Sequence, residues 1–345
     1  MRTPVTVGVL GLGRRGLRLA SIFDELPQTE LRWVCDESAQ ARAVSQSRYP
    51  RALLAADPAE LLEDESLDTI VIATPPETHY GFVGSAINAN KHVFVDEPLA
   101  LTGEQAEDLV HRAEYGDRRL MVGHMVLFHR AVRKLKEMID AGQLGDIYYV
   151  AGSRFAPGPP DVLRRALADD LAVLMYLLAD QPIEVSARGE SYIWPDVPDV
   201  VFCFLKFATG ITAHVHASRL DLRRDARFTA VASRGTAVLD DTGIDCGLTI
   251  YQNAERHPPS DPEERRGPVL GDVVSPRLTG DDPFVVACER FLASVRSPAR
   301  APDNAREAAA IVHVLGAVER SADQNGRREP VADPPAHATV IELPV

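Results

Sequence analysis

The sequence is poor in the features that mark disulfide-rich, zinc-stabilised or membrane proteins. Its four cysteines lie far apart and form no CxxC pair, so neither a disulfide framework nor a structural zinc site is expected. No apolar run reaches the ~18 residues that a membrane helix requires, and the chain opens on strand-forming residues rather than on a signal peptide. These absences predict a cytoplasmic protein.

Positive charge is also scarce. The chain has 37 Lys and Arg against 50 Asp and Glu, which gives a formal net charge of −13. Because binding nucleic acid needs a basic face, nucleic acid is not expected as a partner. A phosphorylated substrate in a locally basic pocket remains compatible with this balance. The length of 345 residues, 45% of them hydrophobic, predicts two domains.

A glycine-rich turn follows the first apolar run. Residues 5–10, VTVGVL, predict a strand, and the next six, GLGRRG, open a helical stretch through about residue 26. In such a turn Gly11 permits the tight bend, Gly13 lets the backbone approach a pyrophosphate, and Gly16 lets the helix pack on the strand. The N–H groups at the start of the helix can then hold phosphate.

An acidic residue stands at the spacing that dinucleotide sites use. The apolar run at residues 31–35 ends on Asp36, twenty residues past Gly16. There a carboxylate accepts the hydroxyls of the adenosine ribose. Asp36 would repel a 2′-phosphate, and the two residues after it, Glu37 and Ser38, offer no arginine to bind one. The sequence therefore favours NAD over NADP.

The hydrophobic pattern divides the chain near residue 123. Before it, strands alternate with helices, which predicts a parallel, doubly wound Rossmann sheet with ligands at the carboxyl ends of its strands. After it, short strands follow one another, which predicts an α+β domain with a large, mostly antiparallel, open sheet. The fold class is thus α/β, with an NAD-binding domain at 1–123 and a substrate and oligomerisation domain at 124–345.

The second domain has two further expected features. Residues 254–283 are rich in Pro, Asp, Glu and Arg, which predicts a long surface loop with one short strand near residue 273. A final pair of helices is expected at 283–295 and 304–323.

Several motifs together resemble the Gfo/Idh/MocA family, named for glucose-fructose oxidoreductase, inositol dehydrogenase and MocA. They are ATPPETH at 73–79, KHV at 91–93, VGHM at 122–125 and GQLGDI at 142–147. HVHASRL at 214–220 resembles the branch that acts on nucleotide-linked sugars, notably UDP-N-acetylglucosaminuronate 3-dehydrogenases. The resemblance implies a bound NAD or NADP, a sugar or polyol substrate, and a dimer or tetramer formed through the open face of the second sheet.

The reactive positions of that family are changed here. Where the family carries Glu-Lys-Pro, this chain reads Asp-Glu-Pro, so Glu97 replaces the lysine. On the catalytic helix, a register without gaps from the Tyr-Leu-Leu segment at 176–178 puts Arg165 on the catalytic aspartate and Asp169 on the histidine. The same register puts Asp170 on the aspartate of the family's His-Asp pair.

These exchanges remove groups that each contribute ~10²–10⁴-fold to such a reaction. A cation ~4 Å from a developing alkoxide is worth roughly 4 kcal/mol at an effective dielectric of ~20, and a carboxylate there reverses the effect. Glu97 can instead stabilise the positive ring of NAD⁺. Arg165 can hold Glu97 as an inverted ion pair, bind a substrate anion, or be an ordinary solvated residue, and a slip of one residue would exchange it with Arg164.

The candidate residues fall into two groups. The catalytic candidates are Glu97, Arg165, Asp169, Asp170 and His124, the last because it follows the final sheet strand and can carry protons. The NAD-binding candidates are Gly11, Leu12, Gly13, Arg14, Arg15, Gly16, Asp36, Thr74, Pro75, His79, Glu97 and Pro98. His214 and His216 share one strand face, but without a third ligand no metal site is assigned.

Three functions stay open at this point. The first is an NAD-dependent oxidoreductase of a sugar or nucleotide-sugar with rearranged groups. The second is an enzyme of redox-neutral chemistry on the same fold, and the third is a dinucleotide or sugar sensor without catalysis. The intact glycine turn and Asp36 fit all three, whereas the missing lysine and histidine favour the last two.

Overall fold

Two β-sheets organise the chain, and each belongs to its own compact unit. The computed structural model describes residues 3–158, 161–195, 197–240, 247–254, 268–297 and 304–331, without the side chains of 161–163. Of these, residues 3–125, 282–297 and 304–312 form one unit, and the described residues within 126–281 and 313–331 form the other. The α/β fold class is confirmed, while the domain boundary at residue 123 stays a prediction.

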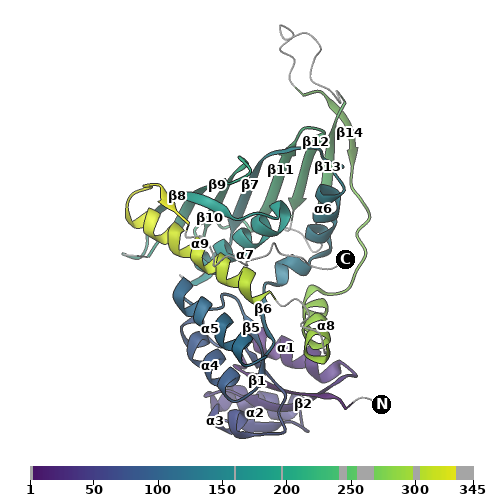
Figure 1. Ribbon diagram of the computed structural model, residues 1–345, viewed down its shortest axis with the longest axis vertical. Coiled ribbons are helices and arrows are strands. Elements are labelled where there is room, and N and C mark those ends of the chain that lie inside the picture. The colour runs from purple at the N-terminus through teal and green to yellow at the C-terminus, as the bar shows by residue number, and fades with distance from the viewer. Residues whose placement is uncertain are drawn as a thin grey trace. The chain divides into compact units, whose positions relative to one another are not determined.

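The first unit contains a parallel sheet with the strand order β3-β2-β1-β4-β5-β6 (Figure 1). Its strands are β1 Val5–Leu10, β2 Thr29–Cys35, β3 Leu53–Ala55, β4 Thr69–Ile72, β5 His92–Asp96 and β6 Leu120–Gly123. Its helices are α1 Arg14–Glu25, α2 Ala39–Arg48, α3 Ala59–Glu63, α4 Pro76–Asn88, α5 Gly103–Tyr115 and α8 Pro283–Arg296. The order, which reverses direction at β1 and β4, is the doubly wound topology that the alternating pattern predicts.

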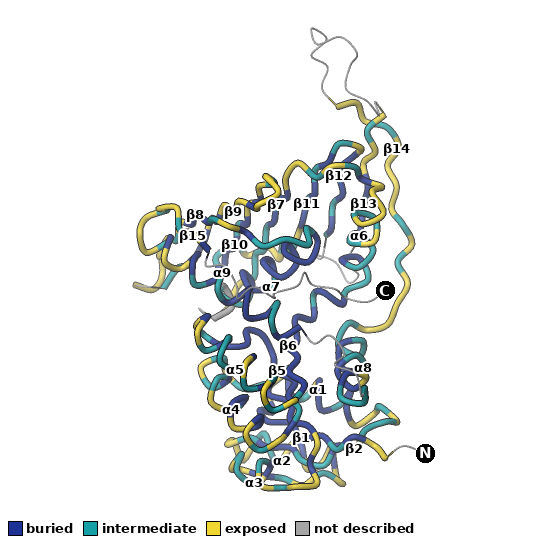
Figure 2. Tube along the Cα trace, viewed as in Figure 1, coloured by how far each residue is buried: buried dark blue, intermediate teal, exposed yellow. Residues whose placement is uncertain are grey.

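Helices cover both faces of this sheet. On one face the rings of Phe23 in α1, Phe94 in β5 and Phe291 in α8 meet edge to face, with centroids 6.5 and 5.5 Å apart. On the other face α3, α4 and α5 pack with the first turns of α9 (Ala305–Asp323) into one buried apolar cluster. A central strand buried on both sides explains the continuous apolar run of β4, whose four residues are all buried. Figure 2 draws the interior of this unit mostly in dark blue, the colour of buried residues.

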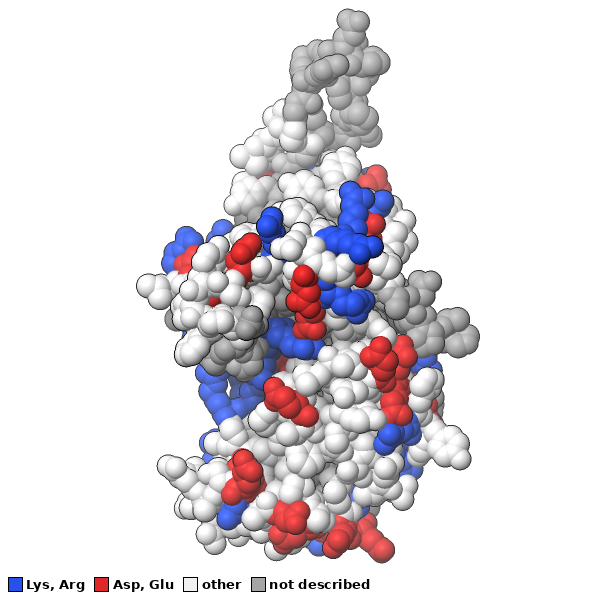
Figure 3. All heavy atoms as spheres, turned by 90° about the vertical axis from the view of Figure 1, so that its left-hand side faces the viewer, with Lys and Arg blue, Asp and Glu red and all other residues white. Residues whose placement is uncertain are grey.

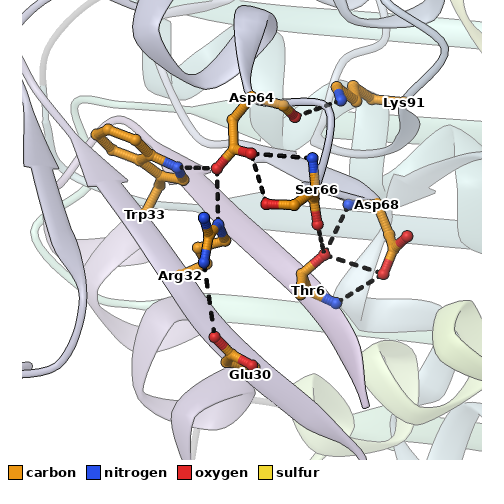
Figure 4. A network of polar contacts seen from close by, with 8 residues as sticks. All are labelled: Thr6, Glu30, Arg32, Trp33, Asp64, Ser66, Asp68 and Lys91. Atoms are coloured by element: carbon orange, nitrogen blue, oxygen red, sulfur yellow. Dashed lines mark hydrogen bonds and ion pairs between the residues drawn. The ribbon is translucent and has the colours of Figure 1, made fainter. Parts of the chain in front are cut away.

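A polar network ties the amino ends of β4 and β5 to β2 (Figure 4). One oxygen of Asp64 accepts hydrogen bonds from Arg32, at 2.6 Å, and from the indole of Trp33, at 2.7 Å. The other oxygen accepts from Ser66, and Lys91 donates to the main-chain oxygen of Asp64 at 2.7 Å. Burial alone would raise the pKa of Asp64, but these hydrogen bonds together lower it well below its usual value.

The second unit contains a sheet with the order β14-β13-β12-β11-β7-β10-β9-β8-β15, antiparallel except between β7 and β10. Its strands are β7 Ile147–Phe155, β8 Pro182–Glu190, β9 Val200–Phe207, β10 Thr212–Ser218, β11 Asp225–Ala232, β12 Gly235–Asp240, β13 Gly247–Asn253, β14 Leu270–Val274 and β15 Glu329–Pro330. The helices α6 Arg130–Asp140 and α7 Asp161–Leu178 pack against one face, and the short helix η1 Met125–Phe128 precedes them.

The opposite face of that sheet carries large exposed side chains. Along β9, Val201, Cys203 and Leu205 are buried, whereas Phe202 and Phe204 alternate with them and are 46% and 63% exposed. His216 of β10 stacks on Phe202 with ring centroids 4.3 Å apart. This alternation leaves an aromatic strip on the open face.

The structure adds local detail to the sequence expectations. Residues 39–63 form α2, β3 and α3, which the pattern did not reveal because α2 buries only Ser45 and so has no apolar stripe. The helix α4 begins at Pro76, since proline is tolerated in the first helical turn. The loop expected over 254–283 lies partly outside the described residues, and its expected strand is β14.

Surface charge is mixed on the face that Figure 3 shows, with Asp and Glu side chains interspersed among Lys and Arg. Among the described helices, none combines the length and the hydrophobicity that crossing a membrane requires.

Candidate functional site

In the glycine turn between β1 and α1, each of the three glycines has different surroundings. Gly11 has a φ of +92°, and a Cβ there would lie 2.7 Å from the carbonyl oxygen of Ala73. A Cβ on Gly16 would lie 1.8 Å from the oxygen of Gly11, so only glycine lets α1 pack this closely. Around Gly13 a Cβ would meet nothing within 4 Å. The turn is therefore closed on its inner side and open at Gly13.

Asp36 is fixed beside that open turn. It follows β2, and one carboxylate oxygen accepts the main-chain N–H of Leu12 at 2.7 Å while the other accepts that of Ser38 at 2.8 Å. Because each carboxylate oxygen has a second lone pair, the group can accept the two ribose hydroxyls in addition. The open space at Gly13, the bare start of α1 and this oriented carboxylate fit an adenosine diphosphate.

The sequence pattern did not indicate a role for one further residue near this turn. Arg42 of α2 donates to the main-chain oxygens of Asp36, at 2.7 Å, and Glu37, at 2.9 Å. It stands six residues after Asp36, beyond the two following residues, Glu37 and Ser38, that the sequence argument considered. Its guanidinium closes the turn after β2 and helps to hold Asp36 in place.

The turns after β4 and β5 are joined by His79. The imidazole is fully buried, with Nε2 2.8 Å from the oxygen of Thr74 and Nδ1 2.7 Å from the oxygen of Pro98. Thr74 also meets Thr78, with the two hydroxyls 2.7 Å apart. His79 therefore acts on the site through the backbone of two turns, and any direct contact with a cofactor stays a prediction.

At the end of β5, two neighbouring carboxylates share one guanidinium. Nη1 of Arg15, in the first turn of α1, contacts Oδ1 of Asp96 at 2.5 Å and also contacts Oε1 of Glu97. The side chains of Asp96 and Glu97 are 5% and 1% exposed. Arg15 was expected in the glycine turn, but its pairing with the residue at the lysine position was not foreseen. The Glu97–Pro98 peptide bond is cis.

His124 completes the titratable groups at this end of the sheet. It follows β6, is almost completely buried, and has a ring nitrogen within 4.8 Å of a carboxylate oxygen of Glu97. The structure thus brings Arg15, Asp96, Glu97 and His124 together at the carboxyl ends of β5 and β6. A carboxylate beside an imidazole can orient the ring and stabilise its protonated form.

The remaining candidates lie on α7 in the second unit. Asp170 is completely buried and accepts from Arg154 of β7 at 2.5 Å, which fastens α7 to the sheet. Burial raises the pKa of Asp170 to about 6, although Arg154 works against this. Arg165 and Asp169 are partly exposed. Arg164 forms an ion pair with Glu319 of α9 at 2.8 Å, which gives that neighbour a structural role.

The two histidines of β10 lie on the open sheet face. His216 contacts the rings of Phe202 and Phe155, with centroids 4.3 and 4.8 Å away, and His214 lies 6.0 Å from the ring of Phe204. Burial lowers the pKa of His216. Their surroundings are aromatic, which suits a packing role for both rings.

Comparisons with known proteins agree with this geometry. Residues 5–124 match the oxidoreductase family with an NAD-binding Rossmann fold, and residues 132–238 match the GFO/IDH/MocA C-terminal domain. The chain therefore belongs to the GFO/IDH/MocA oxidoreductase family, which has an NAD-binding Rossmann domain. The resemblance drawn from the motifs is confirmed.

Two curated relatives illustrate the range of that family. Scyllo-inositol 2-dehydrogenase (NAD(+)) of Bacillus subtilis is 29% identical over 258 residues, covering 68% of this chain and 74% of the relative. UDP-N-acetylglucosamine 3-dehydrogenase of Acidithiobacillus ferrooxidans is 30% identical over 226 residues, covering 64% of this chain and 68% of the relative.

Solved structures show the same fold. A putative NADPH-dependent oxidoreductase from Desulfitobacterium hafniense aligns with a TM-score of 0.85 at 18% identity, covering 97% of this chain and 99% of that one. The structure of the Acidithiobacillus ferrooxidans 3-dehydrogenase aligns with a TM-score of 0.78 at 23% identity, covering 94% and 99%. At these identities the likeness concerns the fold.

Proposed function

We propose that the protein is an NAD-dependent oxidoreductase of a sugar or nucleotide-sugar with a divergent active site. The observation that carries the proposal is the Asp36 carboxylate, held by the N–H groups of Leu12 and Ser38 beside the open turn at Gly13. The substrate class is supported by the inositol and UDP-N-acetylglucosamine dehydrogenases among its relatives.

The dinucleotide would be held at the carboxyl ends of β1, β2, β4 and β5. The main chain of residues 11–16 would bind the diphosphate and Asp36 the adenosine ribose. Thr74, Pro75 and Pro98 would border the nicotinamide, with His79 fixing their backbone. When bound, NAD supplies the hydride chemistry. Because Asp36 repels a 2′-phosphate, NAD should bind more tightly than NADP.

Proton transfer needs a group to replace the missing lysine and histidine. We assign this role to His124, with Glu97 orienting its ring, because a nitrogen and a carboxylate oxygen of the two lie within 4.8 Å. A positioned imidazole contributes ~10²–10⁴-fold to such a reaction. His124→Gln should then remove most of the turnover while leaving NAD affinity unchanged.

Arg165 is proposed to bind an anionic group of the substrate. Its neighbour Arg164 is engaged with Glu319, which favours Arg165 over the register shifted by one. A guanidinium matches a carboxylate or phosphate with two parallel hydrogen bonds. If it instead balances Glu97, as the exchange of signs suggests, Glu97→Lys with Arg165→Asp should be better tolerated than Glu97→Lys alone.

A specific observation also favours a second candidate, a protein that binds NAD without oxidising its substrate. Two buried carboxylates, Asp96 and Glu97, stand where the family resemblance implies a glutamate followed by a lysine, so an anion replaces the cation at position 97. This exchange opposes the formation of an alkoxide and leaves redox-neutral catalysis or sensing as the alternative.

Turnover measurements separate the two candidates. The purified protein is incubated with NAD⁺ and a panel of polyols, hexuronates and UDP-sugars, and the absorbance of reduced nicotinamide is followed. Oxidation of one substrate class that is lost in His124→Gln supports the oxidoreductase. Tight NAD binding without turnover of any member of the panel, in the oxidising or the reducing direction, would favour the sensor or the redox-neutral protein over the oxidoreductase.

The protein is further proposed to form a dimer or tetramer through the open face of the second sheet. The exposed rings of Phe202 and Phe204 give this face an apolar strip that association would cover. Light scattering should report an oligomer at micromolar concentration, and Phe204→Glu should weaken it. A wild-type monomer at that concentration would contradict the proposal.

A further inference from the structure

An asparagine side chain lies along the outer edge of the parallel sheet. The strand β6 ends the strand order and pairs with β5. Asn304, the residue before α9, binds the main chain of Val122 in β6 twice, although the two residues are 182 positions apart in the chain. Its Oδ1 accepts the N–H of Val122 and its Nδ2 donates to the carbonyl oxygen of Val122, both at 2.8 Å. The amide therefore stands where a peptide group of a further strand would pair.

This contact lies in the interior of the first unit. Val122 is fully buried and Asn304 is 8% exposed. Main-chain groups left unpaired in such a place are strongly unfavourable. An asparagine in front of a helix commonly accepts N–H groups of the first helical turn with its side chain. Here the main-chain oxygen of Asn304 accepts the N–H of Ala308 at 2.9 Å, and the side chain serves β6 instead.

The carbonyl oxygen of Val122 connects Asn304 with His124. It accepts the main-chain N–H of His124 at 3.0 Å, which closes a three-residue turn at the end of β6. The same oxygen thus accepts from the side chain of Asn304 and from the residue that bears the imidazole. His124 is 1% exposed and has a ring nitrogen within 4.8 Å of a carboxylate oxygen of Glu97.

The glycine within this turn is closely packed. A Cβ on Gly123 would lie 2.8 Å from Cε of Met125 and 3.0 Å from the ring of Phe94. Gly123 also pairs with Asp96 of β5, which carries the candidate acids at its end. Because a close-packed interior transmits a displacement rather than absorbing it, a shift of Val122 should reach the imidazole.

We propose that Asn304 is a positioning residue of the candidate active site, which sets the place of the His124 imidazole beside Glu97 through the main chain of Val122. The inference rests on the function proposed above, in which His124 transfers the proton. Asn304 acts through the main chain of β6 and has no catalytic role of its own. Its effect on the reaction is large, because misplacing a reacting group by about 1 Å can cost ~10²-fold in rate.

Nuclear magnetic resonance of the full chain with isotope-labelled histidine rings tests the inference. The chain has ten histidines, and the signal of His124 is the one that His124→Gln removes. In Asn304→Ala this signal should move or split. Arg306→Met is the matched control, because Arg306 of α9 pairs with Glu114 of α5 at 2.5 Å and so fastens the same helix start elsewhere. It should leave the His124 signal in place.

Turnover of the substrate that the panel identifies gives the second readout. In Asn304→Ala kcat should fall at least about tenfold. KM for NAD⁺ and the affinity for ADP-ribose should change less than twofold, because the glycine turn and Asp36 follow β1 and β2. Arg306→Met should keep the wild-type kcat. A residue with a structural role alone would lower the melting temperature without moving the His124 signal or kcat.

The outcomes separate this inference from the proposed function. A His124 signal unchanged in folded Asn304→Ala, or displaced equally in Arg306→Met, would overturn the inference and leave the role of His124 intact, as would an unchanged kcat. Wild-type turnover in His124→Gln would overturn both.

A second variant covers a failure to fold. If thermal melting shows that Asn304→Ala does not fold, Asn304→Asp serves in its place. It keeps the acceptor for the N–H of Val122 but loses the donor to the carbonyl oxygen, so it should displace the His124 signal as well. An undisplaced signal in this variant would overturn the inference.

Discussion

The two ends of the parallel sheet hold their carboxylates in different ways. At the amino ends, the carboxylate of Asp64, whose side chain is 14% exposed, accepts hydrogen bonds from Arg32, Trp33 and Ser66. At the carboxyl ends, Asp96 and Glu97 share the guanidinium of Arg15. Several donors to one carboxylate stabilise its charge within the fold, whereas two almost completely buried acids on one guanidinium are the kind of cluster that functional sites contain. We therefore propose a structural role for the first arrangement and a functional role for the second.

The largest effect is expected from removing the shared guanidinium. Arg15→Met leaves two buried acids without that cation and should lower the free energy of unfolding by about 3 kcal/mol. Adding Glu97→Gln to Arg15→Met should restore most of the loss, because one acid remains. Chemical denaturation of the two single variants and the double variant measures this coupling. Additive losses would show that the three groups do not act as a cluster.

The adenosine side should respond in affinity rather than in stability. Asp36→Ala removes the charge-assisted acceptor of two ribose hydroxyls and should weaken NAD binding by about 2–3 kcal/mol, or roughly 30- to 150-fold. The preference for NAD over NADP should narrow, since the repulsion of the 2′-phosphate is gone. Calorimetry with both cofactors is the measurement, and wild-type protein that binds NADP equally well would contradict the assignment of Asp36.

Asp170 of the second unit offers an intermediate case, one buried acid with one guanidinium. Its folded pKa of about 6 lies above the ordinary value of 3.8, so the folded state keeps this proton longer than the unfolded chain. Its contribution to stability is therefore complete below about pH 4 and is lost as the pH rises to about 6. Over that range Asp170→Asn should gain about 2–3 kcal/mol relative to wild type in denaturation experiments. A constant difference between the two proteins would refute this.

The smallest effect is expected at Asp64, with the opposite pH dependence. Its folded pKa is lowered, so its contribution is present above the unfolded value of about 4 and is lost as the pH falls. Asp64→Asn should cost about 2 kcal/mol at neutral pH, because hydrogen bonds to a charged group are weakened. Calorimetry should find NAD affinity unchanged. A loss of NAD affinity in Asp64→Asn would contradict the structural role assigned to the amino ends of the sheet.

The parallel sheet and its turns were predictable because they follow local rules. The strand, the glycines and Asp36 lie close together in the sequence, and Gly16 packs against the carbonyl oxygen of Gly11 within the turn itself. The alternation of strands and helices likewise predicted the doubly wound topology. Residues 39–63 were missed because α2 has no buried apolar stripe to create a periodic signal.

The partners of the acids could not be predicted in the same way. Arg15 and Glu97 are separated by 82 residues, and their contact depends on the pairing of β1 with β4 and β4 with β5. The sequence gives the residue types but not which cation reaches which acid. For Glu97 the register argument proposed Arg165, and the first unit itself supplies Arg15. The role of Arg165 stays a proposal.

A crystal structure of the protein with NAD⁺ bound tests the account most directly. The diphosphate should lie against the main chain at Gly13 and the adenosine ribose on Asp36. Arg15 should still contact both Asp96 and Glu97, and the nicotinamide ring should lie beside these acids at the carboxyl end of β5. A ring more than about 10 Å away, beyond one Debye length, or an Arg15 that leaves the acids for the diphosphate, would contradict the account.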